Sequence, residues 1–516
     1  MRNFIDSPHF ERPGWVTEAL LVVVLLGVLA ASAAWWFFEQ GYLLYYGDAQ
    51  SHLNLSRSII DSRTPGYDQL GTVWLPVLHI ICLPFVERDW LWKTGLAGTI
   101  PVAFCFVVAG TCFYFSGRDA YGGALPAAIV LSCFALNPNI LYLASIPMTE
   151  IVFTAGLAML LLALLRFRAT QRLSFVVLAV GASWWMSLTR YDGWFLIPFA
   201  GLWIAFFAVK RRWFLFIAFS ALASLAPLYW IAHNWWETSN PLDFYNGPYS
   251  AKAIQGAHPY PGYHDWTLAT LYYLAAGKLC AGAALLFLGA AGVVCAAMRK
   301  KTAPVLFLML TPMFYVWSMH SSGNPISVPQ LWPHGYYNSR YGLAVVTLAA
   351  FAAGAIVVAL PAQFKKFAWL LPLVSVSPWI IHSSRENWIC WKESQVNSVS
   401  RRAWTAAGAD FFARHGQSGQ GILTPSGSGD IAGIFCRAEI PLRDTLHVGN
   451  GPAFIANVER PDLVHQELWA VAQAGDPVSS ALRRSRHSAY RVIESIQVPG
   501  APALEIYQRS AAAAEQ

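Results

Sequence analysis

The chain has 516 residues, of which 56% are hydrophobic and only 12% are charged. This composition is too apolar for a water-soluble globular protein and is typical of a protein that crosses a membrane many times. The formal net charge of +7 does not indicate nucleic-acid binding, because the basic residues fall in short clusters between apolar runs.

Apolar runs long enough to cross a bilayer of ~30 Å predict about eleven transmembrane helices. The first run also lacks a convincing cleavage site, so we expect a span there and not a cleaved signal peptide. The predicted spans lie near 16–38, 95–115, 122–137, 151–167, 173–188, 194–209, 213–232, 278–298, 303–319, 342–360 and 367–381.

Clusters of Lys and Arg predict the orientation of these spans. They occur at every second connection, and short connections rich in Lys and Arg stay in the cytoplasm. The other connections, and the segment after the last span, are therefore expected on the exoplasmic side. The clusters are Arg2 with Arg12, Arg118, Arg166 with Arg168 and Arg172, Lys210 with Arg211 and Arg212, Arg299 with Lys300 and Lys301, and Lys365 with Lys366.

The composition changes after residue 381, where apolar runs shorten and charges return. We therefore predict a mainly α-helical transmembrane domain over 1–381 and a small exoplasmic α/β domain over 382–516. Strands are expected at 421–423, 490–496 and 503–507, and helices at 403–414 and 464–474. The eight cysteines form no CxxC pair, and pairing of Cys390 with Cys436 stays open.

Two carboxylates stand where predicted spans meet the exoplasmic side. Asp48 follows the first span, and the spacing of apolar residues over Ser51–Ile60 predicts a short helix in the membrane interface just after it. Glu150 begins the fourth span. Either acid could act as a general base in a shared pocket. The alternatives are a helix cap for Asp48 and a favourable dipole interaction for Glu150.

Arg190 and Arg340 lie in exoplasmic connections beside Tyr191 and Tyr341. A guanidinium at headgroup depth suits a phosphate, because its fork of donors matches phosphate oxygens and it stays charged. The tyrosines could hydrogen-bond the same phosphate. Ordinary contacts with lipid headgroups explain the arginines equally well, and an interfacial aromatic belt explains the tyrosines.

Five short motifs, in their order along the chain, resemble those of bacterial membrane glycosyltransferases of the C-type (GT-C) superfamily. The similarity runs from about residue 15 to 400 and is greatest to the dolichyl-phosphate-mannose–protein mannosyltransferases and their lipid-modifying relatives. The motifs are Gly47-Asp48-Ala49-Gln50, Pro147-Met148-Thr149-Glu150, Thr189-Arg190-Tyr191-Asp192-Gly193-Trp194, the segment from Asn240 to Ser250, and Asn338-Ser339-Arg340-Tyr341-Gly342.

This resemblance implies a polyprenyl-phosphate sugar as donor and a glycan, lipid or protein as acceptor. It makes Asp48 the catalytic carboxylate and Glu150 the second acid, and it places Arg190 or Arg340 near the lipid phosphate. His79, Asp192, Asn246 and Tyr249 are then expected to contact the substrates.

Two departures from the family leave the acceptor open. Ala49 follows Asp48, where the protein mannosyltransferases often have a second acid. The tryptophan-rich signature of oligosaccharyltransferases is echoed only in part, by the segment His233–Glu237.

The chemistry fits a single displacement that inverts the anomeric centre, because the phosphate leaving group needs positive charge more than it needs an acid. No cofactor or metal is required, although two acids could hold a divalent cation.

The resemblance implies the bacterial inner membrane, with the active site on the periplasmic side. A flippase of lipid-linked sugars, an oligosaccharyltransferase-like enzyme and an inactive assembly subunit are the alternatives. A transporter would more often place its polar residues near the midplane of repeated halves.

Overall fold

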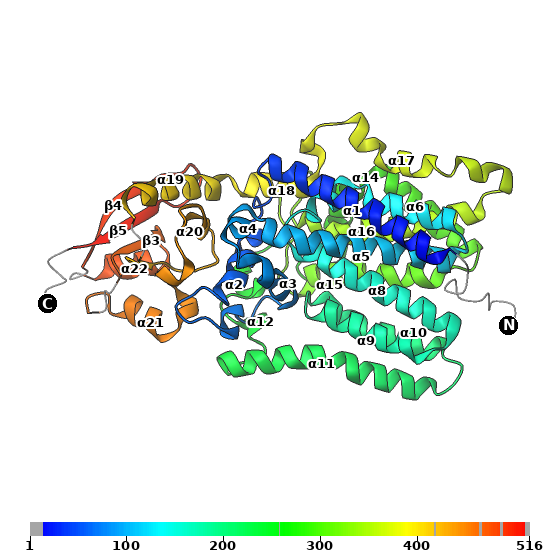
Figure 1. The fold of residues 1–516 in the computed structure, drawn as a ribbon, viewed down its shortest axis with the longest axis horizontal. Helices are drawn as coiled ribbons and strands as arrows, with labels where there is room; N and C mark the ends of the chain where they lie inside the picture. Colours follow the sequence, from blue (N-terminus) through cyan, green and yellow to red (C-terminus); the bar gives the residue numbers. More distant parts are fainter. Residues whose placement is uncertain (1–13, 257, 417–418, 464–466, 486–488, 511–516) are drawn as a thin grey trace. The chain divides into compact units, whose positions relative to one another are not determined.

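The computed structural model describes residues 14–256, 258–416, 419–463, 467–485 and 489–510. The chain divides into two compact units (Figure 1). The helical unit comprises Met1–Gln40, Thr72–Leu78 and Ile100–Glu393, and the sheet unit comprises Gly41–Gly71, His79–Thr99 and Ser394–Gln516. The domain boundary expected at residue 381 stays a prediction. Arg2 and Arg12, from the first basic cluster, lie outside the described residues.

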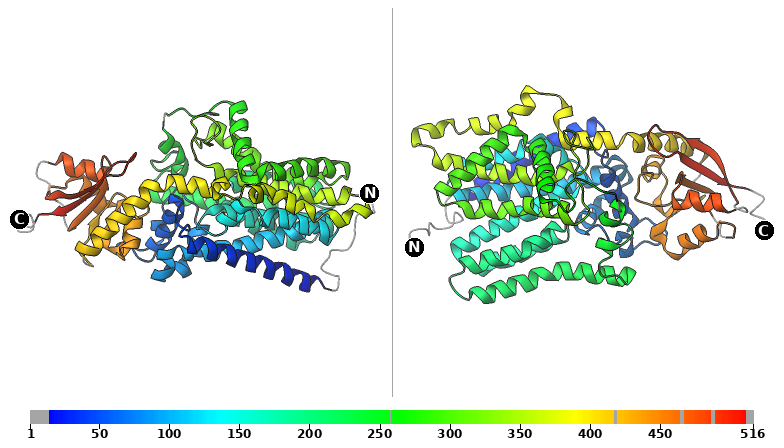
Figure 2. Two further views of the ribbon diagram at one scale, coloured as in Figure 1. Left: turned by 90° about the horizontal axis from the view of Figure 1, so that it is seen from above. Right: turned by 180° about the vertical axis from the view of Figure 1, so that it is seen from behind.

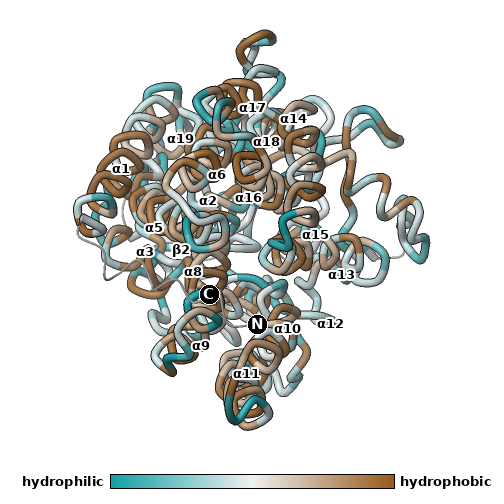
Figure 3. Tube along the Cα trace, turned by 90° about the vertical axis from the view of Figure 1, so that its right-hand side faces the viewer, coloured by the Kyte–Doolittle hydropathy of each residue, from teal (hydrophilic) through white to brown (hydrophobic). Residues whose placement is uncertain are grey.

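Each of the eleven predicted spans coincides with an apolar helix, which confirms the mainly α-helical membrane fold. Figure 3 shows brown, the hydrophobic end of its colour scale, in many turns of these helices. Eight helical segments in the described residues are long and apolar enough to cross a membrane. Helices α6, α9 and α10 are shorter, with 12, 15 and 16 residues. The eleven are α1 Trp15–Glu39, α5 Leu96–Tyr121, α6 Ala124–Ala135, α8 Thr149–Thr170, α9 Leu173–Ser187, α10 Asp192–Phe207, α11 Arg212–Thr238, α14 Trp266–Met298, α15 Thr302–Ser321, α16 Leu343–Ala359 and α17 Leu370–Ile381.

Burial separates central helices from outer ones. An 18-residue window of α8 is 89% buried, whereas the corresponding windows of α1 and α11 are 22% buried. Helix α16 is apolar on all sides, as expected for a helix surrounded by others, and it packs along α14. Helices α8 to α11 lie side by side in Figure 1 and in the right-hand view of Figure 2. The starts of α8, α10 and α16 carry the polar residues considered below.

Short helices complete the helical unit. They are α7 Pro138–Leu143, α12 Asp243–Asn246, α13 Ala251–Gln255, the 3-10 helices η3 Ser339–Gly342, η4 Ala362–Phe367 and η5 Arg385–Asn387, and the start of α18 Ile389–Asn397.

The sheet unit contains a five-stranded mixed sheet in the order β2-β1-β3-β5-β4. Strand β1 pairs in parallel with β2 and β3, whereas β5 is antiparallel to β3 and β4. The apolar face of the sheet packs against α21 and α22. The shared core includes Leu423, Ala470 and Tyr507 of the sheet. The small C-terminal sheet domain is therefore confirmed.

The remaining strands and helices have the following bounds. The strands are β1 Ile422–Leu423, β2 Thr445–Leu446, β3 Trp469–Gln473, β4 Tyr490–Ile496 and β5 Leu504–Arg509. The helices are α2 Gly47–Ser58, η2 Tyr67–Leu70, α3 Val77–Val86, α4 Asp89–Thr94, α19 Val399–His415, α20 Gly433–Arg437, η6 Leu442–Asp444, η7 Val448–Asn450, α21 Pro452–Glu459 and α22 Pro477–Arg484.

One helix prediction for this unit is wrong. Residues 464–474 were expected to be helical, but residues 464–466 lie outside the described residues and Trp469–Gln473 form β3. Four consecutive residues of β3 are buried, because this strand lies between β1 and β5. A strand buried on both faces has no alternation of polar and apolar residues, so its short apolar run resembles a buried helix.

The helix expected over Ser51–Ile60 is present as α2, and it begins four residues earlier than predicted. Most of its residues are buried within the protein. Cys390 and Cys436 are both buried, free cysteines, so no disulfide joins them in this structure.

Candidate active site

A tight turn between α9 and α10 brings Arg190 into the helical unit. The backbone N–H of Arg190 donates to the carbonyl of Met186 at 2.9 Å. A Cβ on Gly193 would lie 2.6 Å from the carbonyl carbon of Met186, so the turn requires glycine there. The Arg190 side chain is directed inward and is only 15% exposed.

Glu150 joins the two predicted phosphate-binding arginines. It lies in the first turn of α8, and its Oε1 accepts from Arg190 Nη1 at 3.2 Å and from Arg340 Nε at 3.0 Å. Its Oε2 is buried without a hydrogen-bond partner in the described structure. Residues that are 40 and 190 positions apart in sequence therefore share a single carboxylate oxygen.

Arg340 is also held by a residue that the sequence analysis did not identify. Glu393, on α18, accepts from Arg340 Nη1 at 2.9 Å through Oε1. Its Oε2 accepts from the backbone N–H of Ser339 at 2.7 Å and from the Ser339 hydroxyl. A Cβ on Gly342 would lie 2.5 Å from the carbonyl oxygen of Ala276, so glycine lets the η3 turn pack directly on α14.

Asp192 and two tyrosines complete this arrangement. Asp192 Oδ1 lies 3.3 Å from Arg190 Nε, and its Oδ2 accepts from the Tyr315 hydroxyl at 2.7 Å. The ring of Tyr315 stacks on that of Tyr341 at 4.8 Å, and the Arg190 guanidinium lies 5.1 Å from the Tyr341 ring centroid. Tyr341 therefore contacts Arg190 through its ring.

We call Glu150, Arg190, Asp192, Arg340 and Glu393 the arginine network. The side chains of its three acids are 4%, 2% and 1% exposed, and those of Arg190 and Arg340 are 15% and 11% exposed. With all five groups ionised, three negative charges face two positive ones. The acids of the network therefore outweigh the positive charge that a phosphate would meet there.

The other predicted residues of the helical unit lie outside this network. The Tyr191 hydroxyl donates to the carbonyl of Val73 at 2.7 Å and accepts from Trp230 Nε1 at 3.1 Å, so its hydrogen-bonding capacity serves the fold. Asn246, the last residue of α12, and Tyr249 are exposed in the segment between α11 and α13, and Asn246 accepts from Asn240 at 2.8 Å.

Asp48 and His79 belong to the sheet unit. Asp48 lies half-buried in the first turn of α2, whose N-cap is Tyr46, so it does not occupy the capping position. His52 follows one turn later, and its Nδ1 lies 2.9 Å from His79 Nε2. Burial, and secondarily the charge of His52, lowers the pKa of His79 well below its usual value, so His79 stays neutral.

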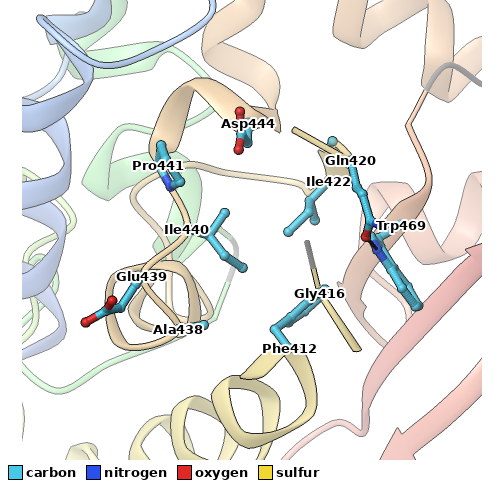
Figure 4. A pocket seen from close by; sticks show the side chains of 11 residues that line it. Phe412, Gly416, Gln420, Ile422, Ala438, Glu439, Ile440, Pro441, Asp444 and Trp469 are labelled. Carbon is cyan, nitrogen blue, oxygen red and sulfur yellow. Dashed lines mark hydrogen bonds between the residues drawn. The ribbon is translucent and has the colours of Figure 1, made fainter. Parts of the chain in front are cut away.

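A small pocket of about 90 Å³ lies elsewhere in the sheet unit. Figure 4 shows Ile422 and Ile440 directed into it, whereas the carboxylate of Glu439 points away. None of the predicted site residues lines this pocket. Among the described residues, no group of three or more His, Cys, Asp and Glu side chains is arranged to hold a metal ion.

Tyr315 and Glu393 are the two members of the site that the sequence analysis missed. Tyr315 lies within a predicted span, where a polar group is itself a sign of function. Glu393 follows the last predicted span and was assigned to the C-terminal domain, so nothing in its local sequence connects it to Arg340.

No family model matches the chain, and no curated protein matches it by sequence. Among solved structures, the chain is similar to ArnT from Cupriavidus metallidurans bound to undecaprenyl phosphate, with 14% identity and a TM-score of 0.57 over 96% of this chain and 98% of that chain. It is similar to the same protein in the apo state with 14% identity and a TM-score of 0.56 over 97% and 98% of the two chains. The chain therefore has the ArnT-like GT-C fold, which is the fold that the resemblance of its motifs implied.

Proposed function

We propose that the protein is an integral-membrane glycosyltransferase that transfers a sugar from a polyprenyl-phosphate-linked donor to an acceptor on the exoplasmic face, with inversion. The observation that carries this proposal is the GT-C fold, shared over nearly the whole chain with a protein that binds undecaprenyl phosphate. The bacterial inner membrane is the proposed location. Glycans, lipids and proteins all remain candidate acceptors.

The arginine network supports the proposed donor. Four of its members lie in the first turns of α8 and α10 or in the turns before α10 and α16, as expected for a site at the membrane surface, and the fifth, Glu393, lies on α18. A transporter would more often place such groups near the middle of its spans. Arg190 and Arg340 offer fixed guanidinium groups to an anionic leaving group, whose charge grows as the glycosidic bond breaks.

Asp48 is the proposed general base. Its half-buried carboxylate lies in the first turn of α2, where the helix N-terminus interacts favourably with a negative charge. It can then accept the proton of an acceptor hydroxyl or amine as that atom attacks the anomeric carbon. Neutral His79 would orient His52 through their hydrogen bond.

The remaining residues receive narrower proposed roles. Tyr341 supports Arg190 through its ring, and Tyr191 supports the turn through its bonded hydroxyl. Asp192 is proposed to hold Arg190 through Nε, whereas Glu150 contacts its Nη1. Asn246 and Tyr249, on an exposed loop, are proposed to contact the acceptor.

Transfer of radiolabelled sugar from polyprenyl-phosphate donors by the purified protein tests this function directly. We expect label to appear in an acceptor fraction from bacterial envelopes, and to be absent with the Asp48→Asn variant. Failure of transfer with every donor, combined with movement of the lipid-linked sugar across a vesicle bilayer, would favour a transporter.

Replacing Arg190 or Arg340 by Lys is expected to weaken donor binding by about 1–3 kcal/mol, because lysine keeps the charge but loses the two-pronged donor geometry. Titration of each variant with undecaprenyl phosphate measures the change. Arg414→Lys, at an exposed position on α19, is a control that should bind as the parent does. Unchanged binding in both test variants would reassign these arginines to a structural role.

The alternation of basic clusters predicts that the C-terminus lies outside the cytoplasm. A fusion of alkaline phosphatase after Gln516 should be active, because that enzyme needs an oxidising compartment to form its disulfides. A fluorescent reporter that folds only in the cytoplasm should be inactive at the same position. The reverse pattern would overturn the proposed sidedness.

A further inference from the structure

Glu393, the last residue of the helical unit, is almost completely buried. Its side chain is 1% exposed, on the first turns of α18 and more than fifty residues after the η3 turn that it contacts. Burying a carboxylate costs several kcal/mol unless its oxygens are well paired. An apolar residue of similar size would fill the same space without that cost.

Every neighbour that hydrogen-bonds Glu393 is a donor. Ser339 contributes its backbone N–H at 2.7 Å and its hydroxyl, and Arg340 contributes Nη1 at 2.9 Å. An amide in place of the carboxylate would turn an –NH₂ group toward one of these donors. The site is therefore built for a carboxylate, and not for a polar side chain in general.

The two acids fix Arg340 from two directions. Glu150 takes the Nε–H at 3.0 Å and Glu393 takes an Nη1–H at 2.9 Å. Because a guanidinium is planar, two bonds to different nitrogens fix both its position and the orientation of its plane. The Ser339 contacts in turn anchor Glu393 to the turn that carries Arg340.

We propose that Glu393 is a positioning residue for the donor phosphate, acting through the guanidinium of Arg340. The inference rests on the proposed function, in which Arg340 binds the phosphate of a polyprenyl-phosphate lipid. It assigns a task to a residue outside the motifs and makes the start of α18 part of the donor site.

Charge and orientation predict opposite effects of neutralising Glu393. The arginine network carries three acids and two arginines, so removing one negative charge should strengthen phosphate binding if net charge alone mattered. If Glu393 acts by orienting Arg340, the same substitution should weaken binding, since the guanidinium loses the carboxylate that holds its Nη1.

The decisive measurement is the affinity of purified variants for undecaprenyl phosphate. Glu393→Gln is expected to bind about 10-fold more weakly than the parent, with a raised KM for the donor. Glu393→Asp keeps the charge but shortens the side chain, so it should also bind more weakly and is the variant to use if the Gln protein does not fold. Equal or tighter binding in a folded variant would reject the positioning role.

A double-mutant cycle with Arg340→Lys tests whether the effect passes through Arg340. We expect the loss from Arg340→Lys to be clearly smaller in the Glu393→Gln background than in the parent, because the two residues act as one unit. Additive losses would contradict the proposal.

A matched buried pair provides the control. Glu467 is held by both Nη atoms of Arg63, at 2.5 and 2.6 Å, and its side chain is 4% exposed. Glu467→Gln should lower thermal stability without changing lipid affinity. If the parent itself does not bind undecaprenyl phosphate, the proposed phosphate role fails together with this inference. Normal parental binding with unchanged affinity in the Glu393 variants rejects the inference alone.

Discussion

Replacing Asp48 by Asn is expected to lower turnover by about 10²–10⁴-fold while the protein folds and binds donor normally. Asn has nearly the same shape as Asp but cannot take a proton from an acceptor in the working pH range. The structural cost should be small, because Asp48 lies within the first turn of α2 and the N-cap is Tyr46. Losing a charge near a helix N-terminus costs about 0.3–1 kcal/mol.

Three measurements on the Asp48 variant separate catalysis from folding. Turnover with a radiolabelled donor should fall, whereas undecaprenyl phosphate affinity and the thermal midpoint should stay close to the parent's. Asp89→Asn is a suitable control, since Asp89 is also an acid in the first turn of a helix of the sheet unit but is 64% exposed. Near-parental turnover in a folded Asp48→Asn protein would reject the base assignment and leave Glu150 as the next candidate.

The membrane helices could be predicted because their signal is local. A run of apolar residues long enough to span a bilayer is visible in any window of the sequence. Even the shorter helices α6, α9 and α10 were recognised, because the neighbouring spans and the basic clusters fixed the alternation of cytoplasmic and exoplasmic connections. Their ends were less certain, and α14 begins twelve residues before its predicted span, which started at residue 278.

The C-terminal sheet was harder to predict, because its central strand depends on distant partners. Strand β3 pairs with β1 on one side and β5 on the other. Its sequence, Trp-Ala-Val-Ala-Gln, carries no alternation that would mark one face as exposed. Strand β2 is only two residues long and was not predicted at all. Local patterns therefore identified the type of domain but not all of its strands.

The site shows the same division between local and distant information. Motifs at the ends of spans identified Glu150, Arg190 and Arg340, and the structure brings these three into one network. Their pairing could not be read from the sequence, which suggested lipid contacts and arginine groups open to a phosphate. Glu393 was missed because its role depends on a contact with a residue 53 positions away.

Replacing Glu150 by Leu is expected to destabilise the protein by about 3–5 kcal/mol, because removing one partner of a buried ion pair leaves the other charge uncompensated. Both arginines lose a contact at once, since they share the same oxygen of Glu150. A lowered midpoint of thermal unfolding in detergent, followed by tryptophan fluorescence, measures the effect. Thr149→Val is the control, because it removes only one hydrogen bond of 2.8 Å to Arg190 and should shift the midpoint much less.

Glu150→Gln should be far milder than Glu150→Leu, and the reason lies in the two oxygens of Glu150. The amide oxygen can take the place of Oε1 and accept from both arginines, while the –NH₂ group takes the place of Oε2, which has no donor against it. An equal loss of stability in the Gln and Leu variants would contradict this geometry. Turnover then separates the two roles of Glu150. If a folded Gln variant turns over like the parent, Glu150 only holds the arginines. If its turnover falls as much as that of Asp48→Asn, Glu150 takes part in proton transfer during the reaction.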